Sequence, residues 1–103
     1  MRKLTKNYRE GLLKRLQDKK YAAKYLNAAL MDEDPSVFLI ALKDIADARG
    51  ESVAEIAKKS HLNRESLYRT FSKRGNPRLH TLYLILEALG LHLSIKPASP
   101  ARA

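Results

Sequence analysis

Four polar side chains near the middle of the chain could make hydrogen bonds to the bases of a nucleic acid. They are Arg64, Glu65, Ser66 and Arg69. Arginine can donate two parallel hydrogen bonds to O6 and N7 of a guanine, and glutamate can accept one from N4 of a cytosine. If a helix carries these residues into the major groove of DNA, its first turn meets the base edges. Glu65 has an equal alternative role, because a carboxylate in the first turn of a helix also interacts favourably with the helix dipole.

Two predicted helices have to position these residues. The first starts at Ser52, which forms with Glu55 the pattern of a capping box, and apolar residues follow at helical spacing. Asn63 is a good N-cap for the second helix, which we expect from about Arg64 to Ser72. Two helices joined by a short turn, the second with a basic outer face, are typical of a DNA-binding helix-turn-helix. An ordinary helical hairpin with solvated arginines is the alternative.

Further side chains around this motif could hold phosphate groups. The free amides that open the first helix would bind an anion, and hydroxyl, amide and basic side chains nearby would add contacts. The residues that we expect to bind phosphates are Ser52, Asn63, Tyr68, Lys73, Arg74 and Arg78. Each neutralised phosphate releases counterions, so binding to double-stranded DNA should weaken steeply as the salt concentration rises.

The composition favours a polyanionic partner. The 103 residues include 20 Lys and Arg against 11 Asp and Glu, which gives a net charge of +9, and the middle of the chain is mildly acidic while both ends are basic. No cysteine is present, and no apolar run reaches the ~18 residues of a membrane span. We therefore expect a soluble cytoplasmic protein. His61, His80 and His92 are scattered, so we expect no enzyme, metal or cofactor.

The rest of the chain reads as helices followed by one strand. Helices are expected at about residues 7–17, from 18 to an acidic break at 32–34, at 35–48 and at 79–89. Leu91, Leu93 and Ile95 then alternate with other residues, which predicts a short β-strand. A lone strand has no internal partner, and the same strand of a second copy, antiparallel across a two-fold axis, would supply one. We therefore expect a homodimer, with a tail lying on the core as the alternative.

Several blocks of sequence together resemble a known family. They are YAAKYLNAAL at residues 21–30, FLIALKDIADARG at 38–50, NRESLYRTFS at 63–72 and GNPRLHTLYLILEALGL at 75–91. Over roughly residues 20–95 the chain resembles the addiction module antidote proteins, a branch of the phage-repressor helix-turn-helix proteins of the Cro and lambda-repressor type. Such repressors usually have glycine at positive φ in the turn, where this chain has His61. Histidine tolerates that region better than most residues, at a strain of about 1 kcal/mol.

The resemblance implies an antitoxin of a toxin-antitoxin system. Such a protein is a small repressor, encoded beside a toxin, that neutralises the toxin by direct binding and represses their shared promoter. The toxin would be similar to the RelE and HigB ribonucleases. Because DNA binding does not need the N-terminal helices, we expect the toxin there, in contact with Tyr21 and Tyr25, although these residues could equally cap the core. A phage-type transcriptional regulator without a toxin and a protein-interaction module with weak DNA binding are the alternatives.

Together these patterns predict an all-α fold with a short C-terminal β-strand, built as a lambda-repressor-like helix-turn-helix domain with an N-terminal helical extension. Residues 1–34 would form a basic arm and the helical extension, and residues 35–90 the DNA-binding domain. Residues 91–103 would form the dimerisation strand and a disordered tail. The contacts between the two copies would be made by Leu91, Leu93 and Ile95.

Overall fold

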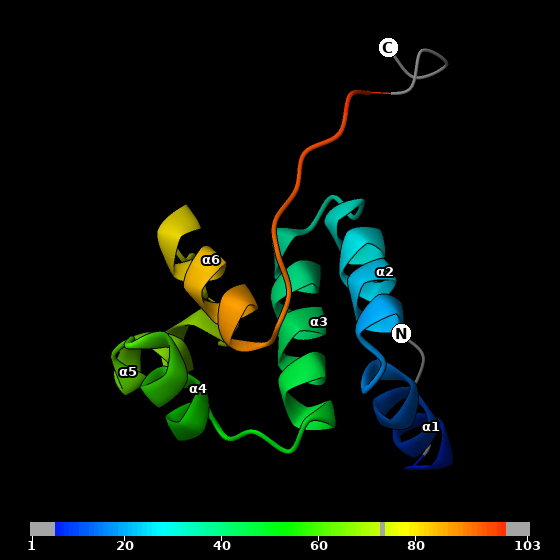
Figure 1. The fold of residues 1–103 in the computed structure, drawn as a ribbon, viewed down its shortest axis with the longest axis horizontal. Helices are drawn as coiled ribbons and strands as arrows, with labels where there is room; N and C mark the ends of the chain where they lie inside the picture. The colour runs from blue at the N-terminus through cyan, green and yellow to red at the C-terminus, as the bar shows by residue number, and fades with distance from the viewer. Residues whose placement is uncertain (1–5, 73, 99–103) are drawn as a thin grey trace.

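All regular secondary structure in the residues that the computed structural model describes, 6–72 and 74–98, is α-helical. The helices are α1 (Lys6–Leu16), α2 (Lys19–Leu30), α3 (Pro35–Ala48), α4 (Val53–Ser60), α5 (Arg64–Thr70) and α6 (Leu79–Ala88). Helix α3 lies between two groups of helices, with α1 and α2 on one side and α4 to α6 on the other (Figure 1). The predicted helices are therefore confirmed, each close to its expected place.

Local signals at the helix starts explain this agreement. Asp34 caps α3: its carboxylate accepts a hydrogen bond of 2.9 Å from the amide of Ser36, and Pro35 occupies the first helical position. The predicted capping box of α4 is confirmed, because the Ser52 hydroxyl accepts from the Glu55 amide at 3.2 Å and the Glu55 carboxylate accepts from the Ser52 amide at 2.9 Å. The hydrogen bond from the Ser52 amide lowers the pKa of the Glu55 carboxyl.

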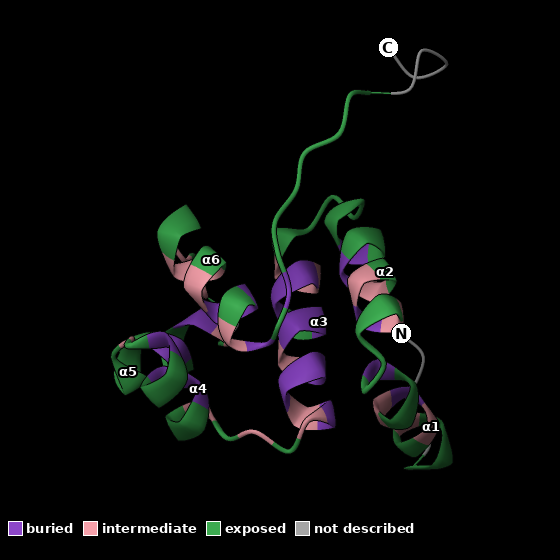
Figure 2. Cartoon of the chain, viewed as in Figure 1, coloured by how far each residue is buried: buried purple, intermediate pink, exposed green. Residues whose placement is uncertain are grey.

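One hydrophobic core connects both groups of helices. Its largest fully buried side chains come from α1, α3, α4, α5, α6 and the residue after α6: Leu16, Leu42, Ile45, Ile56, Leu67, Ile85 and Leu89. Full burial of one such side chain stabilises the fold by about 1.5–3 kcal/mol. Most of α3 is buried, whereas the other helices keep broad exposed faces (Figure 2). The N-terminal helices are therefore packed into the same core as α4 to α6.

The predicted C-terminal β-strand is wrong. After α6 the amide of Leu91 donates a hydrogen bond of 2.8 Å to the carbonyl of Leu86, and Leu91 is buried in the core. Beyond this anchor the described residues up to 98 form no strand and leave the body of the molecule (Figure 1). Alternation of apolar residues gives a strand only where another strand offers hydrogen bonds to the backbone. The helices bond their own backbones, so none of the described segments offers such a partner.

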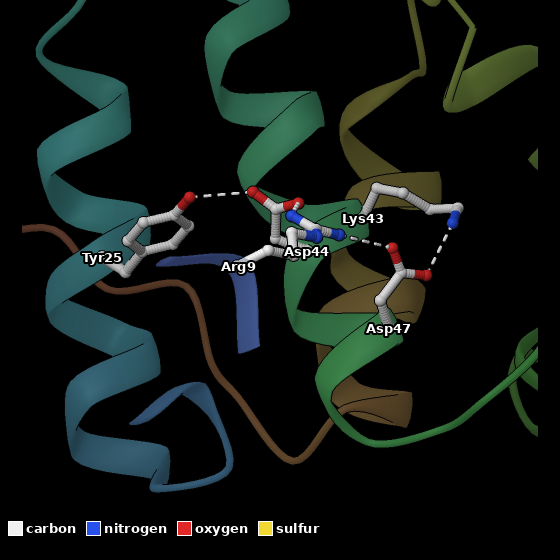
Figure 3. A network of polar contacts seen from close by, with 5 residues as sticks. All are labelled: Arg9, Tyr25, Lys43, Asp44 and Asp47. Carbon is white, nitrogen blue, oxygen red and sulfur yellow. Dashed lines mark hydrogen bonds and ion pairs between the residues drawn. The ribbon is translucent and has the colours of Figure 1, made fainter. Parts of the chain in front are cut away.

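A network of charged and polar side chains ties α1 and α2 to the C-terminal half of α3 (Figure 3). The buried carboxylate of Asp44 accepts a hydrogen bond of 2.6 Å from Arg9 in α1 and one of 2.8 Å from the hydroxyl of Tyr25 in α2. Arg9 also pairs with Asp47 at 3.0 Å, and Asp47 pairs with Lys43 at 2.7 Å. A buried carboxylate is costly unless it is paired and hydrogen-bonded, and here two helices supply the partners.

Replacing Asp44 should loosen the N-terminal helices. Asp44→Ala leaves Tyr25 and one nitrogen of Arg9 without their acceptor, and we expect the free energy of unfolding to fall by about 1.5–3 kcal/mol, the usual worth of hydrogen bonds to a charged group. Urea denaturation monitored by circular dichroism measures this loss. The control is Lys43→Ala, which removes a more exposed ion pair and should cost about 0.5 kcal/mol or less. Equal losses in the two variants would contradict the central role of Asp44.

The Tyr25 hydroxyl should also make stability depend on alkaline pH. Burial raises the pKa of this phenol, and its hydrogen bond to Asp44 raises the pKa further. In the unfolded chain tyrosine ionises near pH 10, so the stabilisation is present below about pH 10 and is lost as the pH rises toward the folded pKa. We expect Tyr25→Phe to flatten the decline in the free energy of unfolding between pH 9 and pH 11. The control Tyr83→Phe, on the exposed side of α6, should keep the decline of the wild type.

Candidate nucleic-acid interface

The corner between α4 and α5 is made by a residue in the left-handed backbone region. His61 has φ 60° and ψ 30° and caps the C-terminal end of α4. Its own amide and that of Leu62, the latter at 3.0 Å, donate to the carbonyl of Ala57. Among the described residues no other residue except glycine has a positive φ. The prediction that His61 occupies this turn in a conformation that usually favours glycine is confirmed.

Asn63 begins α5 directly after this corner. Its side-chain oxygen accepts hydrogen bonds from the amides of Glu65 at 2.7 Å and Ser66 at 3.3 Å. The predicted N-cap is therefore confirmed, and the same oxygen cannot also serve a ligand. A contact from Asn63 to a phosphate would have to come from its side-chain NH₂ group. The Ser52 hydroxyl is in a similar position, because its oxygen accepts from the Glu55 amide while its hydrogen can still be donated.

Helix α5 buries one face and exposes the other. Leu67 is fully buried, and Thr70 is buried with its hydroxyl donating to the carbonyl of Ser66 at 2.9 Å. All the residues predicted to read bases lie on the exposed part of the helix, together with one predicted phosphate ligand: Arg64, Glu65, Ser66, Tyr68 and Arg69. The helix projects from the end of the molecule that is far from α1 and α2 (Figure 1). Its exposed side is therefore open to a partner.

The predicted end of α5 at Ser72 needs a small correction, because the helix ends at Thr70. The amide of Phe71 still donates to the carbonyl of Leu67 at 3.0 Å, but the hydroxyl of Ser72 donates to the carbonyl of Arg69 at 2.6 Å. This side-chain hydrogen bond takes the place of a further helical turn. The chain then turns toward α6, and Lys73, a predicted phosphate ligand, lies outside the described residues.

A polar hollow brings residues of α5 and α6 together. Ser66 and Arg69 line it from α5, and Arg78 and Thr81 line it from the start of α6. Arg78 is the N-cap of α6, but no side chain caps the amides of this helix. Two predicted base readers and one predicted phosphate ligand thus converge on one hollow. Sequence reasoning missed Thr81, and the signal for it was its place in the first turn of the helix that follows Arg78.

Gly75 controls how closely this loop approaches α5. A Cβ atom added at Gly75 would lie 2.0 Å from the carbonyl oxygen of Thr70, which is well inside any contact that real atoms make. The amide of Gly75 donates to the carbonyl of Ser72 at 3.0 Å. The side chain of Arg74, the remaining predicted phosphate ligand, is exposed beside this turn.

The residues predicted to contact protein partners lie on other parts of the molecule. Tyr21 is half-buried, and its hydroxyl accepts from Arg15 at 3.4 Å while its ring lies 5.8 Å from the guanidinium carbon. Tyr25 is half-buried and turned toward Asp44 (Figure 3). Of the predicted dimer contacts Leu91 is buried, whereas the exposed fraction is 40% for Leu93 and 99% for Ile95. None of these residues joins the hollow beside α5.

Two other kinds of site are not found in the described part of the chain. Within residues 6–72 and 74–98 no group of three or more His, Cys, Asp or Glu side chains is arranged to hold a metal ion. No helix formed by these same residues combines the length and the apolar character that crossing a membrane requires.

Comparisons with known proteins agree with the resemblance of the sequence blocks. A family model described as "Probable addiction module antidote protein" matches residues 9–97. A protein of Haemophilus influenzae, described only as an uncharacterized protein, is 36% identical over 72 residues, which cover 70% of this chain and 72% of the relative. No solved structure gives a significant match. Because the family model spans α2 to α6 and most of α1, this chain belongs to the family of addiction module antidote proteins.

Proposed function

We propose that this antitoxin represses its own operon by binding DNA as a dimer and neutralises a RelE-like or HigB-like toxin by direct contact. Membership of the antidote family implies a toxin as partner. The observation that carries the DNA-binding half is the corner at His61, after which α5 exposes Arg64 and Arg69. In this proposal α4 and α5 form a helix-turn-helix of the Cro and lambda-repressor type, and α5 is the helix that enters the major groove.

Exposed side chains of α5 would read the bases. An arginine that donates two hydrogen bonds to one guanine discriminates against the wrong base by about 1–3 kcal/mol. Arg64 and Arg69 are the candidates for such contacts, and Ser66 can add a contact through its hydroxyl. Glu65 can accept from a cytosine. An α-helix with its side chains is about 10–12 Å across, so α5 fits the major groove, which is about 12 Å wide.

The hollow between α5 and α6 would bind the DNA backbone. Arg78 brings a positive charge to a helix start whose amides have no side-chain cap, and both features favour an anion. Arg69 borders the same hollow from the other side, where we keep its role as a base reader. Ser52, Asn63, Tyr68, Lys73 and Arg74 are the further phosphate ligands that we propose. Contacts of this kind fix the register of the protein on the duplex, while the base contacts give specificity.

A dimer would place two α5 helices on an inverted repeat. Half-sites about 34–36 Å apart put both helices in successive major grooves on one side of the duplex. The exposed side chains of Leu93 and Ile95 would contribute to the contact between the copies, while the buried Leu91 anchors the segment in its own core.

The toxin would contact the face of α1 and α2 around Tyr21. The hydroxyl of Tyr25 is already bonded to Asp44, so Tyr25 would contribute only the accessible part of its ring. This face also carries exposed lysines, among them Lys20 and Lys24. These lysines would repel a basic toxin. We therefore propose that the toxin is held by an apolar contact and not by charge attraction.

Removing both exposed arginines of α5 should abolish sequence preference. We expect Arg64→Ala with Arg69→Ala to bind the promoter of its own operon no better than a scrambled duplex in fluorescence anisotropy, because the base contacts are lost. The matched control is Lys20→Ala with Lys24→Ala, which removes the same charge from α2. It should keep the preference. Surviving preference in the arginine variant, with an unchanged circular dichroism spectrum, would rule out α5 as the recognition helix.

The toxin half is tested by coexpression with the protein encoded by the adjacent reading frame. We expect this chain to restore growth and to form a complex with that protein, and Tyr21→Asp to weaken both, because a charge would be placed in an apolar contact. Tyr83→Asp on α6 is the control and should behave like the wild type. If the wild-type chain neither restores growth nor forms a complex, the proposed antitoxin function is ruled out.

A further inference from the structure

An apolar groove lies at the end of the molecule where α2, α3 and α6 meet. We call it the end groove. Its apolar lining comes from the end of α2, the start of α3, the loop after α5 and the start of α6: Leu30, Phe38, Leu39, Pro77, Leu79 and Leu82. Two of these side chains are strongly exposed, Leu30 at 55% and Leu79 at 71%. Helix surfaces that leave large apolar side chains in water side by side usually bind another protein surface.

The C-terminal segment of the chain leaves the body from the same groove. Leu93 is one of its lining residues. Two residues further on, Ile95 is 99% exposed. The segment that follows α6 moves away from the helices (Figure 1). An extended chain advances about 3.3 Å per residue, so Ile95 lies only about 7 Å further along the chain than Leu93. Ile95 and the end groove are thus neighbours on one surface of the protein.

The end groove and the C-terminal segment carry charges of opposite sign. Asp32 lines the end groove, and Glu33 and Asp34 follow it in the exposed loop between α2 and α3. Lys96 comes directly after Ile95 and is exposed. The protein carries a net charge of +9, so two copies repel each other over most of their surfaces. The acidic loop beside the end groove is a place where a basic segment of another copy is attracted instead.

We infer that the end groove receives the C-terminal segment of a second copy of this chain, with Ile95 seated against Leu30 and Leu79 and Lys96 beside Asp32. The exchange is reciprocal across a two-fold axis, so each copy gives one segment and accepts one. This inference rests on the proposed dimer and says how it is built, without a β-strand. Asn76 and Pro77 line both the end groove and the hollow beside α5, so the proposed contact between the copies lies next to the DNA-binding face.

Sedimentation equilibrium of the full chain tests the contact. The wild type should be a dimer, and Ile95→Asp and Leu79→Asp should each raise its dissociation constant at least about tenfold, because either change removes two apolar contacts across the axis. The control is Ile40→Asp, since Ile40 is 60% exposed on α3 and lies outside the end groove. Both altered groove residues are exposed, so circular dichroism should remain that of the wild type. A wild-type monomer, or an Ile40→Asp effect of equal size, overturns the inference.

A crosslink identifies which copy fills the groove. The natural sequence has no cysteine, so Leu79→Cys combined with Ile95→Cys introduces the only two thiols. On mild oxidation we expect a covalent dimer on a non-reducing gel. A crosslinked monomer would mean that each chain fills its own groove, and no crosslink would mean that Ile95 does not reach it. Either result overturns the inference.

The proposed pair of Asp32 and Lys96 gives an independent test of the inference. Asp32→Lys and Lys96→Asp should each weaken the dimer, and the two changes together should restore it, because the attraction is reversed in sign but kept. Failure of the double variant to recover overturns the proposed position of Lys96. Loss of the complex with the adjacent-frame toxin in Leu79→Asp, while the dimer persists, would assign the end groove to the toxin and also overturn the inference. Absence of any operator preference in a wild-type dimer would instead count against the proposed function alone.

Discussion

The burial of Ile56 and Leu67 on the two sides of one corner determines the shape of the candidate interface. Both side chains are fully buried, one in α4 and one in α5. Each contributes about 1.5–3 kcal/mol on burial, whereas the left-handed backbone of His61 costs about 1 kcal/mol. Burial therefore outweighs the strain, and the corner holds although it lacks glycine. The exposed face of α5 points outward because its other face cannot leave the core.

The helices could be predicted from sequence because the signals that start them are made by residues close together in the chain. Asp34 with Pro35, Ser52 with Glu55, and Asn63 each place a capping group within one turn of the amides that need it. The exposed positions of Arg64 and Arg69 followed from the same periodicity. The strand failed because alternation describes only how side chains are arranged. It does not supply the backbone partner that a strand needs.

Other features could not be predicted because they depend on tertiary contacts. In the sequence Asp44 looks like an ordinary charged residue within an apolar helix. Its hydrogen-bond partners in the structure, Arg9 and Tyr25, lie 35 and 19 positions away. The hollow shared by Arg69 and Arg78 depends on how α5 packs against the start of α6, which spacing alone does not give. Tyr25 shows the practical effect. The sequence left two roles open for this aromatic residue, contact with a partner and capping of the core, and in the structure its hydroxyl donates to Asp44 in the core network.

The contact between Gly75 and the carbonyl of Thr70 has a consequence for how this protein can vary. A hydrogen atom is the only substituent that fits between the end of α5 and the turn that leads to α6. The side chain of any other amino acid there would push the end of α5 away from Arg78, which lies at the start of α6. Since neither helix would have to unfold, such a change would leave the protein folded but would alter the spacing between α5 and Arg78. An assay that measures only whether the chain is folded would not detect it.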